Sequence, residues 1–327
     1  MNRKLTVVNQ NWPLKKTFTI SRGKKDSVDL IFLEIQENNN IGRGESVPYL
    51  RYGESVEGVI DEIESIRLEI EGGLNREELN LLQKPGAARN AIDCALWDLE
   101  SKKSGVPAWK CVNNFQSVPL QIALTVSMAS PLEMADEARS YGSCDLLKIK
   151  VGSEKVIESL QEIRKVAPKT KIIVDANEAW SIEQLKSWQS ELVELKISLV
   201  EQPLPAELDH LLTSFDHLVP ICADESCHTK EDILRISDMY DFINIKLDKT
   251  GGLTEALKTK QEAEKYDLGI MIGCMVSTSL SMAPAILLTK DVDFIDLDGP
   301  TFLHEDRKPS VLGELGIIYP ALPELWG

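Results

Sequence analysis

Five short apolar segments each end on a charged residue: LLKIK at 146–150, IIVD at 172–175, SLVE at 198–201, ICAD at 221–224 and INIK at 243–246. Their length and their content of β-branched residues predict buried β-strands, and the intervals between them are long enough for a helix. Strands joined by helices pair in parallel through right-handed crossovers. These segments therefore predict consecutive units of an α/β structure.

The same spacing continues on both sides of this stretch. Further strands are expected near Ile122–Val126, Ile270–Cys274 and Phe294–Leu297, which brings the total to eight. The residues at or just after the eight strand ends recur at intervals of 22 to 28 residues: Thr125, Lys150, Asp175, Glu201, Asp224, Lys246, Cys274 and Asp298. Eight strand-and-helix units of this length predict a (β/α)-barrel, in which catalytic side chains lie at the carboxyl ends of the strands.

The sequence before the barrel predicts a different order of elements, with strands first and helices after them. Short strands are predicted at Leu5–Val8, Val28–Gln36 and Ile41–Glu45, followed by an amphipathic helix from Val56 to Ile70 and another from Ala87 to Lys102. We expect an α+β capping domain over residues 1–117 and the barrel over residues 118–304. The tail, about residues 305–327, is expected to return to the capping domain.

Composition narrows the class of protein. Hydrophobic residues make up 43% of the 327 and charged residues 27%, as in an ordinary globular protein, and the formal net charge is −16. That charge argues against nucleic acid and anionic membranes as partners, since both require a basic surface. Its six cysteines form no C-x-x-C pair, so we expect no zinc site and a reduced, cytoplasmic setting.

One uncharged stretch needs a separate interpretation. No charged residue lies between Asp267 and Lys290, as in a membrane-spanning helix. The stretch is interrupted by glycine, serine, threonine and proline, however, which favours a strand, a loop and a helix of the barrel.

Three acidic residues end consecutive strands: Asp175, Glu201 and Asp224. Three carboxylates at one barrel mouth repel one another strongly unless a cation lies between them. Oxygen ligands with positions left for water and substrate suit Mg²⁺. The alternative is three unrelated loop acids, which the regular placement argues against. We therefore predict one magnesium ion per subunit at these residues.

Three lysines have comparable positions. Lys148 and Lys150 alternate with Ile149, so they share the face of their strand that points into the barrel. Lys246 ends a strand four positions further round and is expected to lie opposite Lys150. A lysine on each side of a substrate provides the acid and the base that inversion at a carbon centre requires. The alternative for the first two is a strand end with exposed lysines.

A carboxylate pair stands at the end of the last strand. Asp296 and Asp298 flank Leu297 and share one face, which suits a substrate ammonium group. The alternative is a solvated loop or a helix cap near Gly299.

These motifs together resemble the enolase superfamily, in its muconate-lactonising branch. The matching segments are KIK at 148–150, VDANE at 174–178, EQPL at 201–204, ADES at 223–226 and NIKLDKTGG at 244–252. The resemblance implies Mg²⁺ at the three acids and acid/base roles for Lys150 and Lys246. A substrate carboxylate would be polarised by Lys148, and its α-proton transferred through an enediolate.

Further segments are similar to bacterial dipeptide epimerases acting on L-Ala-D/L-Glu: FIDLDGP at 294–300, ISRG at 20–23 and GAARNA at 86–91. The resemblance implies that the last carboxylate pair binds the dipeptide ammonium and that a flexible cap loop reads the side chain. The substrate contacts it implies are Arg22, Thr125, Lys148, Cys274, Met275, Asp296 and Asp298. It also implies an isomerase of murein-peptide metabolism with a dipeptide substrate; a homo-oligomer is compatible with it.

Other functions remain open at this point. A cycloisomerase, an o-succinylbenzoate synthase or an N-succinylamino-acid racemase could use the same lysines and metal, but these substrates lack a free ammonium for Asp296 and Asp298. A non-catalytic barrel is disfavoured because unused buried charges destabilise a fold. From its composition alone, Arg22 beside Lys24 and Lys25 resembles a solvated surface residue.

Overall fold

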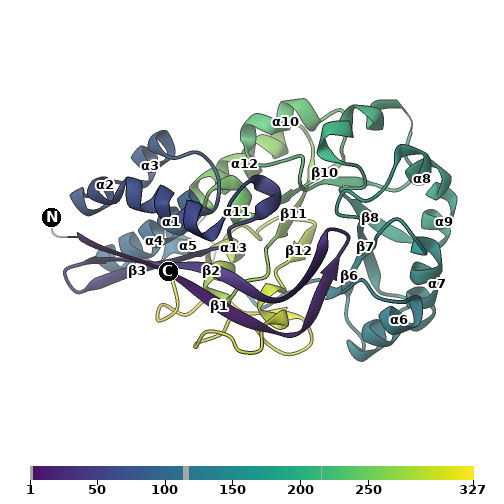
Figure 1. The fold of residues 1–327 in the computed structure, drawn as a ribbon, viewed down its shortest axis with the longest axis horizontal. Helices are drawn as coiled ribbons and strands as arrows, with labels where there is room; N and C mark the ends of the chain where they lie inside the picture. Colours follow the sequence, from purple (N-terminus) through teal and green to yellow (C-terminus); the bar gives the residue numbers. More distant parts are fainter. Residues whose placement is uncertain (1–2, 113–117, 215) are drawn as a thin grey trace.

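A computed structural model describes residues 3–112, 118–214 and 216–327 of the chain. Figure 1 shows a barrel of strands surrounded by helices, with an antiparallel sheet and several helices at one side. The long hairpin of β1 (Arg3–Ile20) and β2 (Gly23–Glu37) extends from those N-terminal helices across to the barrel strands (Figure 1). The arrangement is the expected (β/α)-barrel with a separate α+β cap.

The cap sheet is formed by β1, β2 and β3 (Asn40–Ser46), all antiparallel. Its first strand is much longer than the predicted Leu5–Val8. Most residues of β1 are polar, so the rest of the strand has no apolar run that would predict it. Pairing with β2 continues to Ile20↔Gly23, with a shift in register between Pro13 and Phe18, where proline lacks an N–H to donate.

The cap helices pack on this sheet or on one another. They are α1 (Val56–Ser65), α2 (Arg67–Gly72), α3 (Arg76–Leu82), α4 (Ala87–Ser104) and α5 (Ala108–Val112), with a 3₁₀ turn η1 (Leu50–Tyr52). The single helix expected from Val56 to Ile70 breaks at Ile66, where the backbone leaves the helical region (φ −117°, ψ 21°). α4 lies so close to β3 that a Cβ at Gly44 would stand 2.0 Å from the Ala91 carbonyl oxygen.

Eight parallel strands form the barrel sheet, in the order β12-β11-β10-β9-β8-β7-β6-β5. They are β5 (Leu124–Val126), β6 (Leu146–Lys150), β7 (Lys171–Asp175), β8 (Ile197–Glu201), β9 (Ile221–Ala223), β10 (Phe242–Ile245), β11 (Gly269–Gly273) and β12 (Phe294–Asp296). The Ala123 amide donates to the Ile295 carbonyl at 2.7 Å, which brings the two ends of the sheet together. All eight predicted strands are confirmed.

The connections between strands are mostly helical. They contain α6 (Pro131–Ser140), α7 (Val156–Val166), α8 (Ile182–Ser187), α9 (Gln189–Glu194), η2 (Ala206–Ser214), α10 (Lys230–Ile236), α11 (Leu247–Thr250), α12 (Leu253–Lys265) and α13 (Ser279–Ile286). A 3₁₀ turn, η3 (Gly299–Phe302), follows the last strand. The uncharged stretch before Lys290 is β11 and α13, and none of the described helices is long and apolar enough to span a membrane.

The interior of the barrel is layered. Its lower part is filled by an apolar cluster that includes Leu146, Ile173, Leu199 and Met271. Alternation along β6 then places Lys148 and Lys150 above Leu146 on the same inward face. Charged side chains therefore begin where the apolar filling ends, toward the carboxyl ends of the strands.

The C-terminal segment contacts both the barrel part of the chain and the cap. A short strand, β13 (Ile317–Ile318), pairs with β4 (Leu120–Gln121), and the Trp326 indole donates to the Cys94 carbonyl in α4 at 2.9 Å. The division at about residue 117 lies at 113–117, outside the described residues, so we retain that boundary as a proposal.

Candidate active site

A cavity of about 390 Å³ lies between the cap and the carboxyl ends of the barrel strands. It is lined by ten of the twelve predicted site residues: Arg22, Thr125, Lys148, Lys150, Asp224, Lys246, Cys274, Met275, Asp296 and Asp298. The other two, Asp175 and Glu201, are fully buried and hydrogen-bond or pair with groups of the same cluster. The structure therefore brings all twelve together.

The strand register explains this convergence. Lys150 pairs across the sheet with Asp175, and Asp175 pairs with Glu201, so the three lie at one level of the barrel. Each is the last residue of its strand, at the end where barrel enzymes place their chemistry.

The two lysines with predicted acid/base roles each hold one carboxylate. Lys150 Nζ donates to Asp175 Oδ2 at 2.6 Å, and Lys246 Nζ donates to Asp224 Oδ2 at 2.6 Å. Although burial opposes a charge on Lys246, Asp224 outweighs it and raises the lysine pKa above its ordinary value. In this arrangement the ammonium form of Lys246 is stabilised.

Lys148 lies deeper in the barrel. It contacts two of the predicted metal ligands and also one member of the carboxylate pair at the last strand. Its Nζ lies 2.7 Å from Glu201 Oε2, 3.1 Å from Asp175 Oδ2 and 2.7 Å from Asp296 Oδ2. Burial opposes its charge, but the surrounding carboxylates hold its pKa well above the ordinary range. Lys148 is therefore a fixed cation that also reaches the carboxylate pair at the end of the last strand.

The three predicted metal ligands are directed at lysines in this structure. Among the residues described, no three acidic, histidine or cysteine side chains converge on one point as a ready metal-binding group. Burial, and then Asp175, raise the pKa of Glu201 to about 7. Glu201 Oε2 and Asp224 Oδ1 accept no hydrogen bond of good geometry, although each lies 2.7 Å from a lysine nitrogen. These oxygens suit a hard divalent cation.

Sequence reasoning missed Lys249. This lysine, on α11, is completely buried, with Nζ 2.7 Å from Asp224 Oδ1 and 2.8 Å from the Asn244 carbonyl oxygen. It does not line the cavity, and it holds the oxygen of Asp224 opposite to the one held by Lys246. Lys249 lies in the quoted motif, three residues after Lys246, but the sequence does not indicate where its side chain points.

The carboxylate pair at the end of the last strand is buried, so its interpretation as a solvated loop is wrong. Asp296 and Asp298 are each 4% exposed. The Thr125 amide donates to Asp298 Oδ2 at 2.8 Å, and burial followed by the charge of Asp296 raises the Asp298 pKa to about 7. Lys148 already neutralises Asp296, so Asp298 is the member whose charge a substrate cation can balance.

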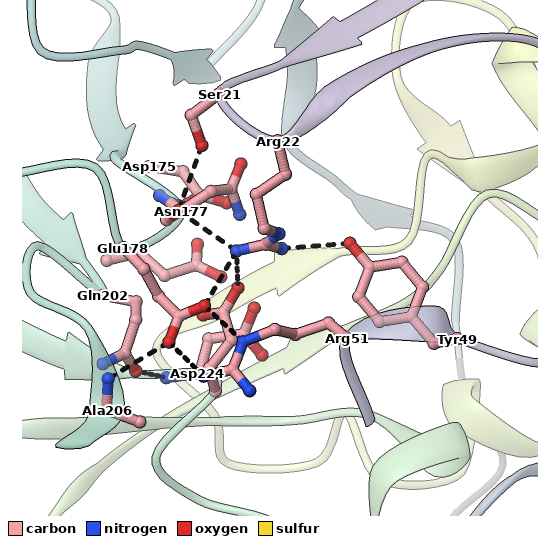
Figure 2. A network of polar contacts seen from close by, with 12 residues as sticks. Ser21, Arg22, Tyr49, Arg51, Asp175, Asn177, Glu178, Gln202, Ala206 and Asp224 are labelled. Carbon is pink, nitrogen blue, oxygen red and sulfur yellow. Dashed lines mark hydrogen bonds and ion pairs between the residues drawn. The ribbon is translucent and has the colours of Figure 1, made fainter. Parts of the chain in front are cut away.

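The hairpin between β1 and β2 brings Arg22 to the barrel. Figure 2 shows its guanidinium between Tyr49 of the cap and the segment after β7. Arg22 donates to the Tyr49 hydroxyl at 3.0 Å and the Asn177 carbonyl at 3.1 Å, and Ser21 Oγ donates to the same carbonyl at 3.0 Å. Arg22 is an exposed residue in this structure, but only a quarter of its side chain is exposed, and its guanidinium is held by hydrogen bonds to the cap and the barrel.

Two further acids meet this hairpin and were not predicted. Arg22 Nη1 lies 2.7 Å from Glu225 Oε1 and 3.2 Å from Glu178 Oε2. Glu178 is also held by Arg51 through two hydrogen bonds of 2.7 and 2.8 Å (Figure 2). Both acids lie within motifs quoted above, VDANE at 174–178 and ADES at 223–226, but their partners are more than a hundred positions away in sequence.

Cys274 and Met275, the two remaining predicted substrate contacts, line the cavity. Met275 packs with Leu14, Val28 and Phe302 in a cluster shared by cap and barrel. Gly299 approaches it so closely that a Cβ would lie 2.7 Å from the Met275 carbonyl oxygen. The backbone at Cys274–Met275 is thereby fixed beside Asp298.

Comparisons with known proteins give consistent matches. The model of the mandelate racemase / muconate lactonizing enzyme N-terminal domain matches residues 2–112, and the enolase C-terminal domain-like model matches residues 132–306. The chain is 40% identical to the L-Ala-D/L-Glu epimerase of Escherichia coli, over 94% of this chain and 97% of that protein. It is 39% identical to the N-acetyl-D-glutamate racemase of a Pseudoalteromonas species, over 91% and 95%.

Solved structures of related proteins have the same fold as this chain. One is an enolase family member from Agrobacterium tumefaciens with homology to dipeptide epimerases, solved with bound sodium and L-Ala-L-Glu. It is 49% identical to this chain with a TM-score of 0.98, and the alignment covers 99% of this chain and 100% of that one. Dipeptide epimerases from Enterococcus faecalis, Cytophaga hutchinsonii and Methylococcus capsulatus, 26% to 32% identical with TM-scores of 0.88 to 0.90, are complexed with Mg and a dipeptide. Each alignment covers 98% of this chain and at least 93% of the other.

Proposed function

The chain belongs to the mandelate racemase and muconate lactonizing enzyme family of the enolase superfamily, and from this premise we propose that it is a dipeptide epimerase interconverting L-Ala-L-Glu and L-Ala-D-Glu. One observation carries the proposal. Lys150 ends β6 and Lys246 immediately follows β10, four strands away in an eight-stranded barrel, and both line one cavity. A substrate carbon between them has a lysine on each face.

The reaction then consists of two proton movements. One lysine, as the free amine, removes the α-proton of the C-terminal residue, and an enediolate forms. The other lysine, as the ammonium ion, returns a proton to the opposite face. Configuration inverts, and no other bond is broken. Lys148 would remain protonated beside the substrate carboxylate, which its carboxylate partners favour.

We propose Mg²⁺ as the cofactor, held by Asp175, Glu201 and Asp224. The donor set fits: three buried carboxylates, two of which have an oxygen without a good hydrogen-bond donor. Bound there, the ion would supply positive charge to the substrate carboxylate and take Asp175 and Asp224 away from Lys150 and Lys246.

We propose that the free ammonium of the dipeptide binds at Asp298. A charge-assisted hydrogen bond to a buried group contributes roughly 1.5–3 kcal/mol. Asp298→Asn should therefore raise KM for Ala-Glu and lower kcat/KM by about ten- to a hundredfold. Initial rates measured by polarimetry over a range of dipeptide concentrations check this.

A racemase of N-acylamino acids is the second candidate, favoured by the 39% identical N-acetyl-D-glutamate racemase. Such a substrate has no ammonium for Asp298. Ala-Glu and N-acetylglutamate, offered to the same enzyme preparation, separate the two functions. Faster turnover of N-acetylglutamate than of Ala-Glu would contradict the epimerase assignment.

We also propose that Arg22 selects the glutamate side chain, because its planar guanidinium can bind a carboxylate through two hydrogen bonds. Ala-Glu should be the best substrate, Ala-Asp a poorer one, and dipeptides ending in lysine or arginine should be rejected. Arg22→Ala should reduce kcat/KM about tenfold or more for Ala-Glu and much less for Ala-Leu. An equal loss for both dipeptides would show that Arg22 does not read the side chain.

The biological setting follows from this substrate. We propose a cytoplasmic enzyme of murein-peptide metabolism, since Ala-Glu is a dipeptide unit of murein. The partner of the chain is then a small dipeptide.

A further inference from the structure

Glu225 is a buried acid that faces the cavity without a role in the reaction. It follows Asp224 at the end of β9, lines the cavity, and its side chain is 1% exposed. Neither carboxylate oxygen accepts a hydrogen bond of good geometry. Its ion pair is with Arg22, at 2.7 Å.

The other acid beside Arg22, Glu178, has its charge balanced by different partners. Glu178 accepts two hydrogen bonds from Arg51 and a third from the Ala206 amide at 3.1 Å. Glu178 therefore keeps its partners whether or not Arg22 is in place. Glu225 has its ion pair with Arg22 alone among the described residues, and Lys246 acts on it from farther away. Without Arg22, a buried carboxylate would therefore face the substrate side-chain end of the cavity with much weaker compensation.

An uncompensated buried charge is strongly unfavourable, and a cation brought by a ligand would relieve that penalty. We propose that Glu225 is a second specificity residue: the counter-ion that holds Arg22 over the cavity and, once Arg22 is removed, selects dipeptides with a cationic C-terminal side chain. This inference rests on the proposed dipeptide epimerase function.

Besides Arg51, which lines the cavity but is paired with Glu178, the cap carries two lysines that bear on this proposal. Lys24 and Lys25 also line the cavity, and Lys25 lies over the Tyr49 ring at 5.4 Å. Both are exposed, so water and salt screen them, whereas Glu225 is removed from solvent. They are expected to weaken the selection of a cationic substrate without abolishing it.

The test compares substrates within each variant. The magnesium-loaded parent, Arg22→Ala, Arg22→Lys and the double variant Arg22→Ala/Glu225→Gln are assayed with L-Ala-L-Lys, L-Ala-L-Leu and L-Ala-L-Glu. The measured quantity is kcat/KM for Ala-Lys divided by kcat/KM for Ala-Leu. Ala-Leu serves as the neutral reference, so that general damage to the site cancels.

The ratio should rise about ten- to a hundredfold in Arg22→Ala. It should stay near the parent value in Arg22→Lys, which keeps a cation beside Glu225, and fall back in the double variant. An unchanged ratio in Arg22→Ala, or an equal rise in the double variant, overturns the proposal.

The experiment distinguishes failure of the Glu225 proposal from failure of the proposed epimerase function. A parent enzyme that converts Ala-Glu, together with an unchanged ratio in Arg22→Ala, removes only the role of Glu225. A parent enzyme that converts no dipeptide removes the epimerase function itself. If Arg22→Ala turns over no dipeptide, thermal stabilisation by Ala-Lys against Ala-Leu decides: greater protection by Ala-Lys supports the proposal, and equal protection overturns it.

Discussion

Replacing either Lys150 or Lys246 by alanine should stop epimerisation, with kcat reduced by a factor of about 10²–10⁴ or more. The two lysines line the same cavity from opposite sides of the barrel, and inversion needs a proton removed on one face and delivered on the other. Neither can replace the other, because each reaches only one face of the substrate carbon. Polarimetry with Ala-Glu measures the loss.

Each single variant should keep half of the chemistry. With one lysine left, the α-proton of one epimer of the dipeptide should still exchange with D₂O, whereas the other epimer should not. The two variants should show opposite preferences. Lys171→Ala, at the exposed opposite end of β7, is the matched control and should be unaffected. If both cavity variants epimerise at the parent rate, the two-lysine mechanism is wrong.

Removal of the metal should have an effect of similar size. Excess chelator is expected to abolish turnover, and added Mg²⁺ to restore it. Asp224→Asn should weaken Mg²⁺ binding by more than about a hundredfold, because substitutions of residues behind metal ligands already cost ten- to a hundredfold. Calorimetric titration measures this affinity independently of activity.

The metal experiment has its own control. Asp238→Asn removes an exposed carboxylate away from the cavity and should bind Mg²⁺ like the parent. Full activity in excess chelator would contradict the magnesium assignment while leaving the lysine mechanism to be judged by the exchange experiment.

The barrel could be predicted because its signals are local and repeated. Each strand is a short apolar run, and residues such as Lys150, Asp175 and Glu201 stand at its end. Parallel pairing then determines that these ends meet. The same regularity allowed the metal and acid/base groups to be proposed together from sequence.

The cap and the ion pairs could be predicted less well, because they depend on packing between distant segments. The length of β1 follows from pairing with β2 and covering the barrel, and its own residues are mostly polar. The ion pair of Arg51 with Glu178 spans 127 positions and that of Arg22 with Glu178 spans 156. No local pattern specifies which of many acids an arginine will meet.

Lys249 illustrates the same limit within the site. Its charge was visible in the motif at 244–252, but only the turn of α11 directs it beneath Asp224, away from the cavity. Sequence spacing identifies strand ends reliably, whereas the direction of a side chain in the following turn requires the three-dimensional structure.

The most direct test is the turnover of L-Ala-L-Glu in D₂O with enzyme and Mg²⁺, followed by mass spectrometry of the separated epimers. The product L-Ala-D-Glu should carry one deuterium from its first appearance, because the second lysine delivers a solvent-derived proton. The substrate recovered at early times should still be largely protiated. Product without deuterium, or no conversion of Ala-Glu with metal present, would contradict epimerisation by two opposed lysines.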